Sequence, residues 1–297
     1  ADIGPPERHN ALYQSFKDQK GSFHSVVLYV ADASPFGPSS FFQDIVTPWF
    51  PAEADTKILS GWFWKASHGV KTTGQLLDIY YASVGRNANL LLNLSPDTRG
   101  LIPDNQIAPL LEAYSVINQT YATDLAAGGT MSADSTLAGQ PASNILDDDL
   151  DTWWEPEAGN STPTVTLNLP AAVTFDRVVL QEAIATRSQR IESFAVDAWI
   201  SDAWTQIGSA TTVGHKRILR ITETTTDQLC IRITQSRLEP SLAQISLHKA
   251  ADVVPSPTIE NRDAAGQVAI TDSNGNAIHF TIDGSEPTTE SPLYTGP

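Results

Sequence analysis

Between about residues 45 and 120, apolar residues recur at helical spacing, then form a short unbroken run, and then return to helical spacing. Thr72 and Gln75 form a capping box ahead of the first periodic stretch, because each side chain can bond a free backbone N–H at the helix start. The run Asn89–Leu94 is typical of a parallel strand buried on both faces. A second amphipathic helix is predicted over 107–117, and Pro109 weakens its start. This order of elements predicts a parallel α/β fold.

After about residue 121 the helical spacing disappears, and short β-rich runs alternate with turns. In Ser193–Trp199, Phe194, Val196 and Ala198 lie at every second position and Ser193 and Asp197 are polar partners between them, the period of two that marks a half-buried strand. Several such runs over about 130 residues predict an antiparallel β-sandwich. The other runs are Thr164–Leu169, Arg177–Gln181, Lys216–Thr222 and Gln228–Thr234.

The length of 297 residues predicts two or three domains. We expect an α/β segment over 1–120, a β-sandwich over 121–251 and a partial small β domain over 252–297, with Val253–Pro257 as the linker. In the last segment, Ile278–Ile282 is expected to be a strand that leads into a turn.

The charge and the apolar pattern exclude two classes of function. The chain has 18 Lys and Arg against 34 Asp and Glu, and 18 − 34 gives a net charge of −16. A surface this acidic repels phosphate, so we expect no nucleic-acid partner. No apolar run reaches the roughly 18–20 residues that span a bilayer, so no membrane insertion is expected.

Ordered motifs over 46–115 resemble the α-L-fucosidases of glycoside hydrolase family 29. They begin with Pro51-Ala52-Glu53-Ala54-Asp55, Gly61-Trp62-Phe63-Trp64 and Leu76-Leu77-Asp78-Ile79-Tyr80-Tyr81. They continue with Val84-Gly85-Arg86-Asn87-Ala88-Asn89-Leu90-Leu91-Leu92-Asn93, Pro96-Asp97 and Arg99-Gly100-Leu101-Ile102. The residues of the Pro-Ala-Glu and Gly-Trp-Phe-Trp motifs are more similar to the branch of the family that cleaves α-1,3/1,4-linked fucose.

The rest of the chain resembles modules that accompany such enzymes. Gln181–Ile184, Gln189–Ile191 and Gly214–Leu219 resemble the discoidin-like (F5/8 type C, galactose-binding-like) sandwich, which implies a carbohydrate-binding module. Phe280–Pro297 is similar to the C-terminal domain of chitobiases. Together the resemblances imply a multidomain α/β plus all-β chain: the C-terminal part of a (β/α)8 barrel, an antiparallel sandwich and a partial small β domain.

The resemblance implies retaining hydrolysis of terminal α-L-fucose from fucosylated oligosaccharides or glycoproteins, with no cofactor for catalysis. Retention needs two carboxyl groups about 5–5.5 Å apart, one that attacks and one that protonates the leaving oxygen. The family's nucleophilic Asp lies on an upstream barrel strand and has no match in this chain, so the remainder of the barrel is an expected partner. The alternatives are a non-catalytic, lectin-like fragment and, less well supported, a structural β-rich protein.

Two carboxylates and one arginine are candidates for the sugar site. Glu53 is the candidate acid/base, because apolar neighbours near the end of a barrel strand would raise its pKa by desolvation. The alternative is a structural carboxylate that pairs with Arg8 or Arg86, or a solvated strand-end charge. Arg8 follows a Gly-Pro pair as in the family, which implies substrate binding, and Glu7 is a weaker candidate acid.

Three aromatic residues follow the same predicted strand. Trp62 is the best candidate for substrate binding, because an indole suits the apolar ring face and C6 methyl of fucose. Trp64 is a second candidate, and the alternative for both is a place in the core. His68 lies beside Gly69 in a loop, where a structural role is favoured.

The segment 142–153 resembles the calcium loop of discoidin-like domains. The side chains of Asp147, Asp149 and Thr152 and the backbone carbonyl of Ala142 offer hard oxygen ligands for a structural Ca²⁺. The family usually completes the shell with Glu, but Gln244 stands there, so a weaker site is expected. The alternative is a solvated acidic turn.

Sequons predict a secreted, extracellular glycoprotein. Asn118 and Asn160 each begin an Asn-x-Ser/Thr sequon, and Pro96 weakens a third sequon at Asn93. We therefore expect glycosylation at Asn118 and Asn160.

Overall fold

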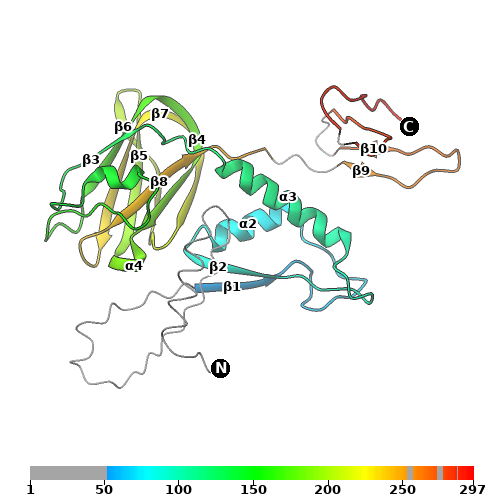
Figure 1. Cartoon of the computed structure of the whole chain (residues 1–297), viewed down its shortest axis with the longest axis horizontal. Coiled ribbons are helices and arrows are strands. Elements are labelled where there is room, and N and C mark those ends of the chain that lie inside the picture. The colour runs from blue at the N-terminus through cyan, green and yellow to red at the C-terminus, as the bar shows by residue number, and fades with distance from the viewer. Residues whose placement is uncertain (1–51, 253–256, 273–276, 286) are drawn as a thin grey trace, which may run out of the picture. The chain divides into compact units, whose positions relative to one another are not determined.

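The computed structural model describes residues 52–252, 257–272, 277–285 and 287–297 (Figure 1). The chain divides into two compact units, Ala1–Ala251 and Asp252–Pro297. The described part of the first unit begins with two parallel strands and two helices, and a six-stranded antiparallel sheet follows.

The α/β segment is built around strands β1 (Ala52–Lys57) and β2 (Ala88–Asn93), which pair in parallel with Glu53 opposite Asn89. Parallel neighbours need a crossover, and helix α2 (Thr73–Ser83) provides it. The predicted capping box is confirmed, because Thr72 accepts from the Gln75 backbone N–H and the Gln75 side chain accepts from Thr72 N. Within residues 52–252, the pair β1–β2 stays open and forms no closed barrel.

One face of this pair is exposed, which contradicts the expectation that β2 is buried on both faces. Leu92 packs against the apolar cluster formed with α2 and α3, whereas Leu91 is 53% exposed. Successive side chains on a strand point to opposite faces, so Leu91 shares its face with the exposed residues Glu53 and Asp55. Nothing in the described chain covers that face, so the apolar run alone overestimates burial.

Helix α3 (Asp104–Tyr121) follows β2 and packs against α2. Pro109 lies inside this helix, yet the helix continues for twelve residues beyond it. Buried residues Ala113, Val116 and Thr120 recur at helical spacing on the packed side, so tertiary packing outweighs the local cost of proline.

The five β runs predicted for the sandwich fall in only three strands. The two runs near 164 and 177 form one strand, β4 (Thr164–Glu182), and the runs near 216 and 228 form another, β7 (Arg217–Ser236). Register shifts interrupt their pairing between Asn168 and Val173, so the strands bend where turns were predicted. The remaining strands are β3 (Thr130–Ala133), β5 (Ile191–Ile200), β6 (Ala203–Ala210) and β8 (Leu242–His248).

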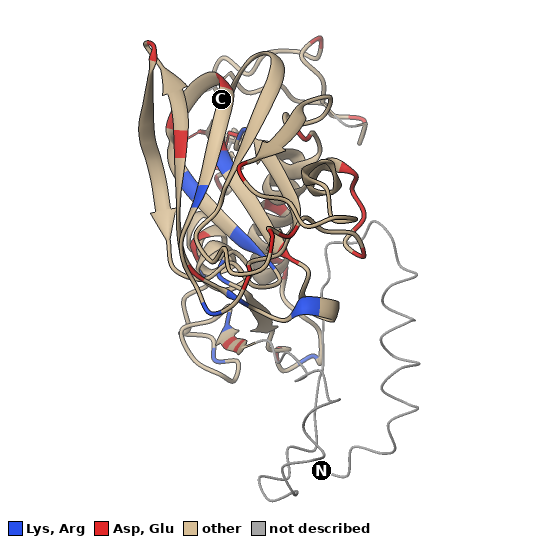
Figure 2. Cartoon of the chain, turned by 90° about the vertical axis from the view of Figure 1, so that its left-hand side faces the viewer, with Lys and Arg blue, Asp and Glu red and all other residues tan. Residues whose placement is uncertain are grey.

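These strands pair in the order β3-β4-β7-β5-β6, and β8 pairs with β4. The core between them is apolar and includes the fully buried residues Trp154, Phe175 and Phe194. A short 3₁₀ helix, η1 (Ala142–Leu146), and a short helix α4 (Ile184–Arg187) lie in the loops. Figure 2 shows basic positions on strands and acidic positions at many of the loops.

The sandwich contacts helix α2 through a tyrosine enclosed by two arginines. The guanidinium carbons of Arg177 and Arg220 lie 5.0 and 4.9 Å from the ring centroid of Tyr81, which is buried. Arg177 Nε donates to the Tyr81 hydroxyl at 3.1 Å, and Arg220 pairs with Asp78 at 2.8 Å. Cation–π contacts of this kind are favourable when partly desolvated.

The same junction includes apolar and backbone contacts. Val179 and Ile218 of the sandwich belong to one apolar cluster with α2. Ile218 N donates to Gly85 O at 2.9 Å, and Asn87 Oδ1 accepts from His215 N at 2.7 Å. The α/β segment and the sandwich therefore share a core and are not merely tethered.

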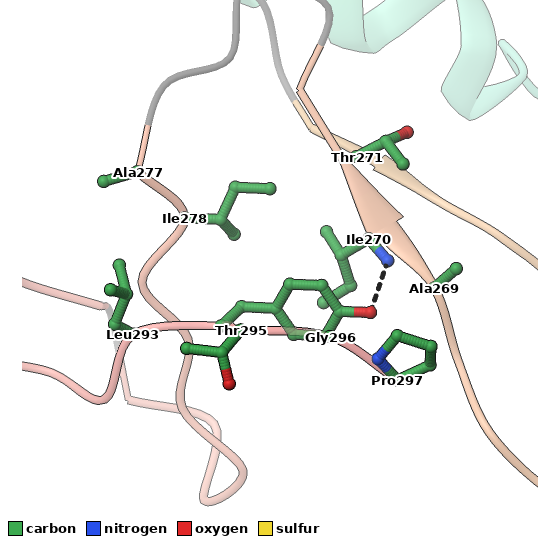
Figure 3. A pocket seen from close by; sticks show the side chains of 10 residues that line it. Ala269, Ile270, Thr271, Ala277, Ile278, Leu293, Thr295, Gly296 and Pro297 are labelled. Atoms are coloured by element: carbon green, nitrogen blue, oxygen red, sulfur yellow. Dashed lines mark hydrogen bonds between the residues drawn. The ribbon is translucent and has the colours of Figure 1, made fainter.

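The C-terminal unit has little regular structure in its described residues. Strands β9 (Thr258–Ile259) and β10 (Ile270–Thr271) pair, and the strand expected over 278–282 is reduced to one bridge between His279 and Leu293. Tyr294 lines an open hollow of 560 Å³, and its hydroxyl accepts from Ile270 N at 3.0 Å (Figure 3).

Candidate functional site

The carboxyl edge of β1 and β2 holds the loop that carries Trp62. The Trp62 carbonyl accepts from Asn93 Nδ2 at 2.9 Å and from Ser95 Oγ at 2.8 Å. Asn93 ends β2 and Ser95 follows it, so both donors come from the same edge of the sheet. In parallel α/β folds, ligand sites form at this edge.

A buried glutamine on α3 holds this edge through hydrogen bonds to the backbone of Ser95. Gln106 is fully buried, its Oε1 accepts from Ser95 N at 3.2 Å, and its Nε2 donates to Ser95 O at 2.9 Å. The pair satisfies four polar groups that would otherwise be costly to bury. The sequence analysis did not identify Ser95 or Gln106 as functional residues, because the helix predicted over 107–117 begins after Gln106, whereas α3 begins at Asp104.

Two aromatic side chains project from this edge into solvent. Trp62 is 46% exposed and Phe63 is 82% exposed. The ammonium nitrogen of Lys57, the last residue of β1, lies 5.0 Å from the centroid of the Trp62 indole. Trp64 is half-buried and packs against the apolar cluster of the α/β segment. The arrangement offers an apolar wall with a cation beside it, which can hold the apolar face of a sugar.

Glu53 lies at the other end of the strand, so its predicted position near the strand end is wrong. Pairing with β2 begins at Ala52, which makes Glu53 the second residue of β1. At about 3.3 Å per residue, four residues separate Glu53 from Lys57 by about 13 Å along the strand. Its side chain is exposed, and the predicted apolar neighbours Trp49 and Phe50 lie outside the described residues. The acid/base role of Glu53 stays a prediction.

Of the other residues considered for the sugar site, only His68 lies within the described part of the chain. Arg8 and Glu7 lie outside the described residues. His68 lies in the loop that carries Trp62, and its buried Nδ1 has no hydrogen-bond partner within the described part of the chain. The structure therefore brings together Trp62, Trp64 and His68 from the predicted set, and leaves Glu53 apart.

The acidic loop of the sandwich is held by its own hydrogen bonds. Thr152 Oγ1 donates to Asp147 Oδ2 at 2.6 Å and to Asp149 O at 3.0 Å, so these three oxygens lie together. Asp149 Oδ1 accepts from Asp151 N, and the Asp149 atom that Thr152 Oγ1 contacts is the backbone carbonyl oxygen, so the role of the Asp149 carboxylate as a ligand stays a prediction. The described residues contain no group of three or more His, Cys, Asp or Glu side chains arranged for a metal ion.

The remaining predicted ligands, Gln244 and Ala142, lie beside the loop. Gln244 Nε2 donates to Asp148 Oδ1 at 2.6 Å, and its Oε1 accepts from Gln181. Ala142 begins the 3₁₀ helix η1, which packs against β8. Asp148 adopts a φ of 62°, a left-handed conformation that Asp tolerates better than most residues. The oxygen donors of such a loop are the type of ligand that a hard cation prefers.

The two sequons lie in different settings. Asn118 is half-buried on helix α3, and Thr120 of the same sequon is buried and donates to Val116 O. Asn160 lies in a loop, where its Oδ1 accepts from Thr162 N at 3.2 Å. A loop setting suits glycosylation better than a packed helix. None of the helices in the described part of the chain is long and apolar enough to cross a membrane.

Three family models match successive parts of the chain. The alpha-L-fucosidase model matches residues 39–117, the F5/8 type C domain model matches 130–241, and the chitobiase/beta-hexosaminidase C-terminal domain model matches 258–297. Alpha-L-fucosidase 1 of Arabidopsis thaliana is 35% identical over 207 residues, which are 67% of this chain and 41% of the plant protein. A rice protein with the provisional name alpha-L-fucosidase 1 is 33% identical over 225 residues, 74% of this chain and 42% of that protein.

Solved structures agree with these matches. A fucosidase of Ruminococcus gnavus, solved in complex with fucose, is 31% identical with a TM-score of 0.64, covering 69% of this chain and 42% of that one. The chain spans about two fifths of the length of the plant relatives that it matches. The resemblance predicted from the motifs is thereby confirmed: successive segments of the chain match the alpha-L-fucosidase, F5/8 type C domain and chitobiase/beta-hexosaminidase C-terminal domain models, in that order.

Proposed function

We propose that this chain forms the C-terminal part of an α-L-fucosidase that hydrolyses terminal α-L-fucose from glycans with retention. The observation that carries the proposal is the position of Trp62, inside the fucosidase-matched segment and at the carboxyl edge of a parallel strand pair. The matched relatives and the fucose-bound neighbour support the substrate class.

In this proposal, β1, β2 and their helices are the last part of a (β/α)8 barrel. The exposed face that carries Leu91, Glu53 and Asp55 would then line the barrel interior, which the remainder of the barrel would close. The open strand pair supports this assignment, because unpaired edges and an exposed Leu call for a covering partner. The attacking aspartate would come from that remainder.

Residues of this chain would bind and orient the sugar. The Trp62 indole would contact the apolar face and C6 methyl of fucose, and the hydrogen bonds from Asn93 and Ser95 would keep its loop in place. Lys57 beside the ring would meet a sugar hydroxyl. The finer preference for α-1,3/1,4 linkages, secretion and glycosylation at Asn160 belong to the same proposal, supported by the motif wording and the sequons.

The sandwich would act as a carbohydrate-binding module with one structural Ca²⁺. Support comes from the grouping of Asp147 Oδ2, Asp149 O and Thr152 Oγ1 in one loop. Gln244 would join through its amide oxygen, in place of the hydrogen bond that it now accepts from Gln181. The cation would neutralise the acidic loop and fix its backbone.

Turnover of an aryl α-L-fucoside by the full-length protein that contains this chain tests the proposal. Release of nitrophenol from the α-L-fucoside, with no release from the matching β-D-galactoside, is the expected result. One observation favours the alternative of a lectin-like fragment: Glu53 lies at the far end of β1 from Trp62. Binding on a glycan array by a folded protein that releases no nitrophenol would support that alternative and end the enzyme proposal.

A further inference from the structure

The loop between β1 and α2 closes on itself and is not a free excursion. Leu59 and Val70 form an antiparallel bridge, and Ser60 N donates to Gly69 O at 2.9 Å. Lys71 N donates to Ile58 O at 2.9 Å below that bridge. The two ends of the loop that carries Trp62 are therefore held together by backbone hydrogen bonds.

Inside the loop, an imidazole lies directly against a glycine. A Cβ added to Gly61 would sit 2.1 Å from His68 Cε1 and within 2.9 Å of both ring nitrogens, so any larger residue at this position would displace the imidazole. The buried Nδ1 of His68 has no hydrogen-bond partner within the described residues. Among the described residues, the contact with Gly61 and not a hydrogen bond of Nδ1 therefore places the ring.

This contact lies next to the residue proposed to bind sugar. Gly61 precedes Trp62, whose carbonyl is held on its other side by Asn93 and Ser95. The segment Gly61-Trp62 is thus held by hydrogen bonds at the Trp62 carbonyl and by the imidazole that lies against Gly61. We propose that His68 is a positioning residue that, through its contact with Gly61, holds the Trp62 indole in the orientation that binds sugar. The functional half of this inference rests on the proposed fucosidase activity.

The inference predicts how variants affect substrate binding. In His68→Ala the space beside Gly61 opens, and the indole adopts its binding orientation for only part of the time. If that fraction falls to between about a tenth and a fifth, the apparent dissociation constant rises about five- to tenfold. We expect KM for an aryl α-L-fucoside to rise by this factor and kcat to stay within about twofold. His68→Phe keeps a ring against Gly61 without the unpaired nitrogen, so it restores the wild-type KM.

The closing experiment does not require activity. The full chain is labelled with 5-fluorotryptophan, and the ¹⁹F resonances of Trp62 and Trp204 are assigned by their loss in Trp62→Phe and Trp204→Phe. Trp204 is a matched control, because it is 44% exposed and lies in the sandwich. His68→Ala should shift or broaden the Trp62 resonance and leave that of Trp204 unchanged, and His68→Phe should reverse the effect. Gly61→Ala, which pushes the imidazole away, should reproduce it.

An unchanged Trp62 resonance in His68→Ala would overturn the inference. Equal shifts of both resonances, or a lost Trp62 signal in His68→Phe, would also overturn it, because they indicate a general structural role. Wild-type protein that releases no nitrophenol ends the proposed function alone, since the resonance of Trp62 still reports whether His68 positions it.

Discussion

Replacement of Tyr81 tests whether the fucosidase-like segment and the sandwich fold as one body. Tyr81 is a residue of α2, yet its ring and hydroxyl contact arginines of β4 and β7 in the sandwich. If the two parts only share a tether, these contacts contribute little to stability. If they share a core, graded truncation of Tyr81 removes identifiable contributions in turn.

The structure sets the size of each step. Tyr81→Phe removes the hydrogen bond from Arg177 and should lower the free energy of unfolding by about 1.5 kcal/mol, because the donor is charged and mostly buried. Tyr81→Leu also removes two cation–π contacts of about 0.5–1 kcal/mol each, which brings the loss to about 3 kcal/mol. Tyr81→Ala adds a cavity beside the cluster around Ile218, for a total of about 4–5 kcal/mol.

Chemical denaturation of the three variants, followed by tryptophan fluorescence, measures these losses. Tyr114→Ala on α3 is the matched control, because Tyr114 is an exposed tyrosine of the same segment and should change stability by less than about 0.5 kcal/mol. We expect one cooperative transition for the wild type. A Tyr81→Ala variant as stable as Tyr114→Ala, or a wild type that unfolds in two separate steps, would refute the shared core.

Two further predictions concern the sandwich. Burial raises the pKa of Glu182 to about 7, although three backbone N–H groups donate to its carboxylate. The folded chain thus keeps a proton that the unfolded chain loses above pH 4.5, and its stability falls as pH rises from there to 7. Glu182→Gln does not titrate at this position. The unfolding free energy of the wild type minus that of the variant should therefore fall by about 2 kcal/mol from pH 5 to pH 8. A difference that stays constant over this range would contradict a Glu182 pKa of about 7. Millimolar Ca²⁺ should raise the Tm of the wild type and not that of Asp147→Ala, and equal Tm values with Ca²⁺ and with chelator would exclude the calcium site.

Local signals in the sequence predicted local structure well. The Thr72 and Gln75 pair marks the start of α2 because the capping box is made by residues three apart, and no distant contact is needed. The run Ser193–Trp199 likewise identifies β5, but the predicted half-burial is wrong, because Ala195 and Asp197 on the second face are buried as well as Phe194 on the first.

Features that depend on distant parts of the chain were not predictable in the same way. The runs that join into β4 and β7 contain turn-like residues, and pairing between the two long strands carries them across those positions. The exposure of Leu91 depends on what covers the face of β2, which the strand's own residues do not encode. Glu53 lies near the start of β1 because the pairing with β2 begins at Ala52, and pairing is a property of both strands.

The most direct test of the account compares two tryptophans of nearly equal exposure in the full-length protein. Trp62 lies at the proposed sugar site and is 46% exposed, and Trp204 lies on the sandwich and is 44% exposed. The measurement is KM for an aryl α-L-fucoside in Trp62→Ala and in Trp204→Ala. Loss of an aromatic contact of about 1.5 kcal/mol should raise KM more than tenfold in Trp62→Ala, while Trp204→Ala keeps the wild-type value. Equal KM values in the two variants would contradict the placement of the sugar site at the carboxyl edge of β1 and β2.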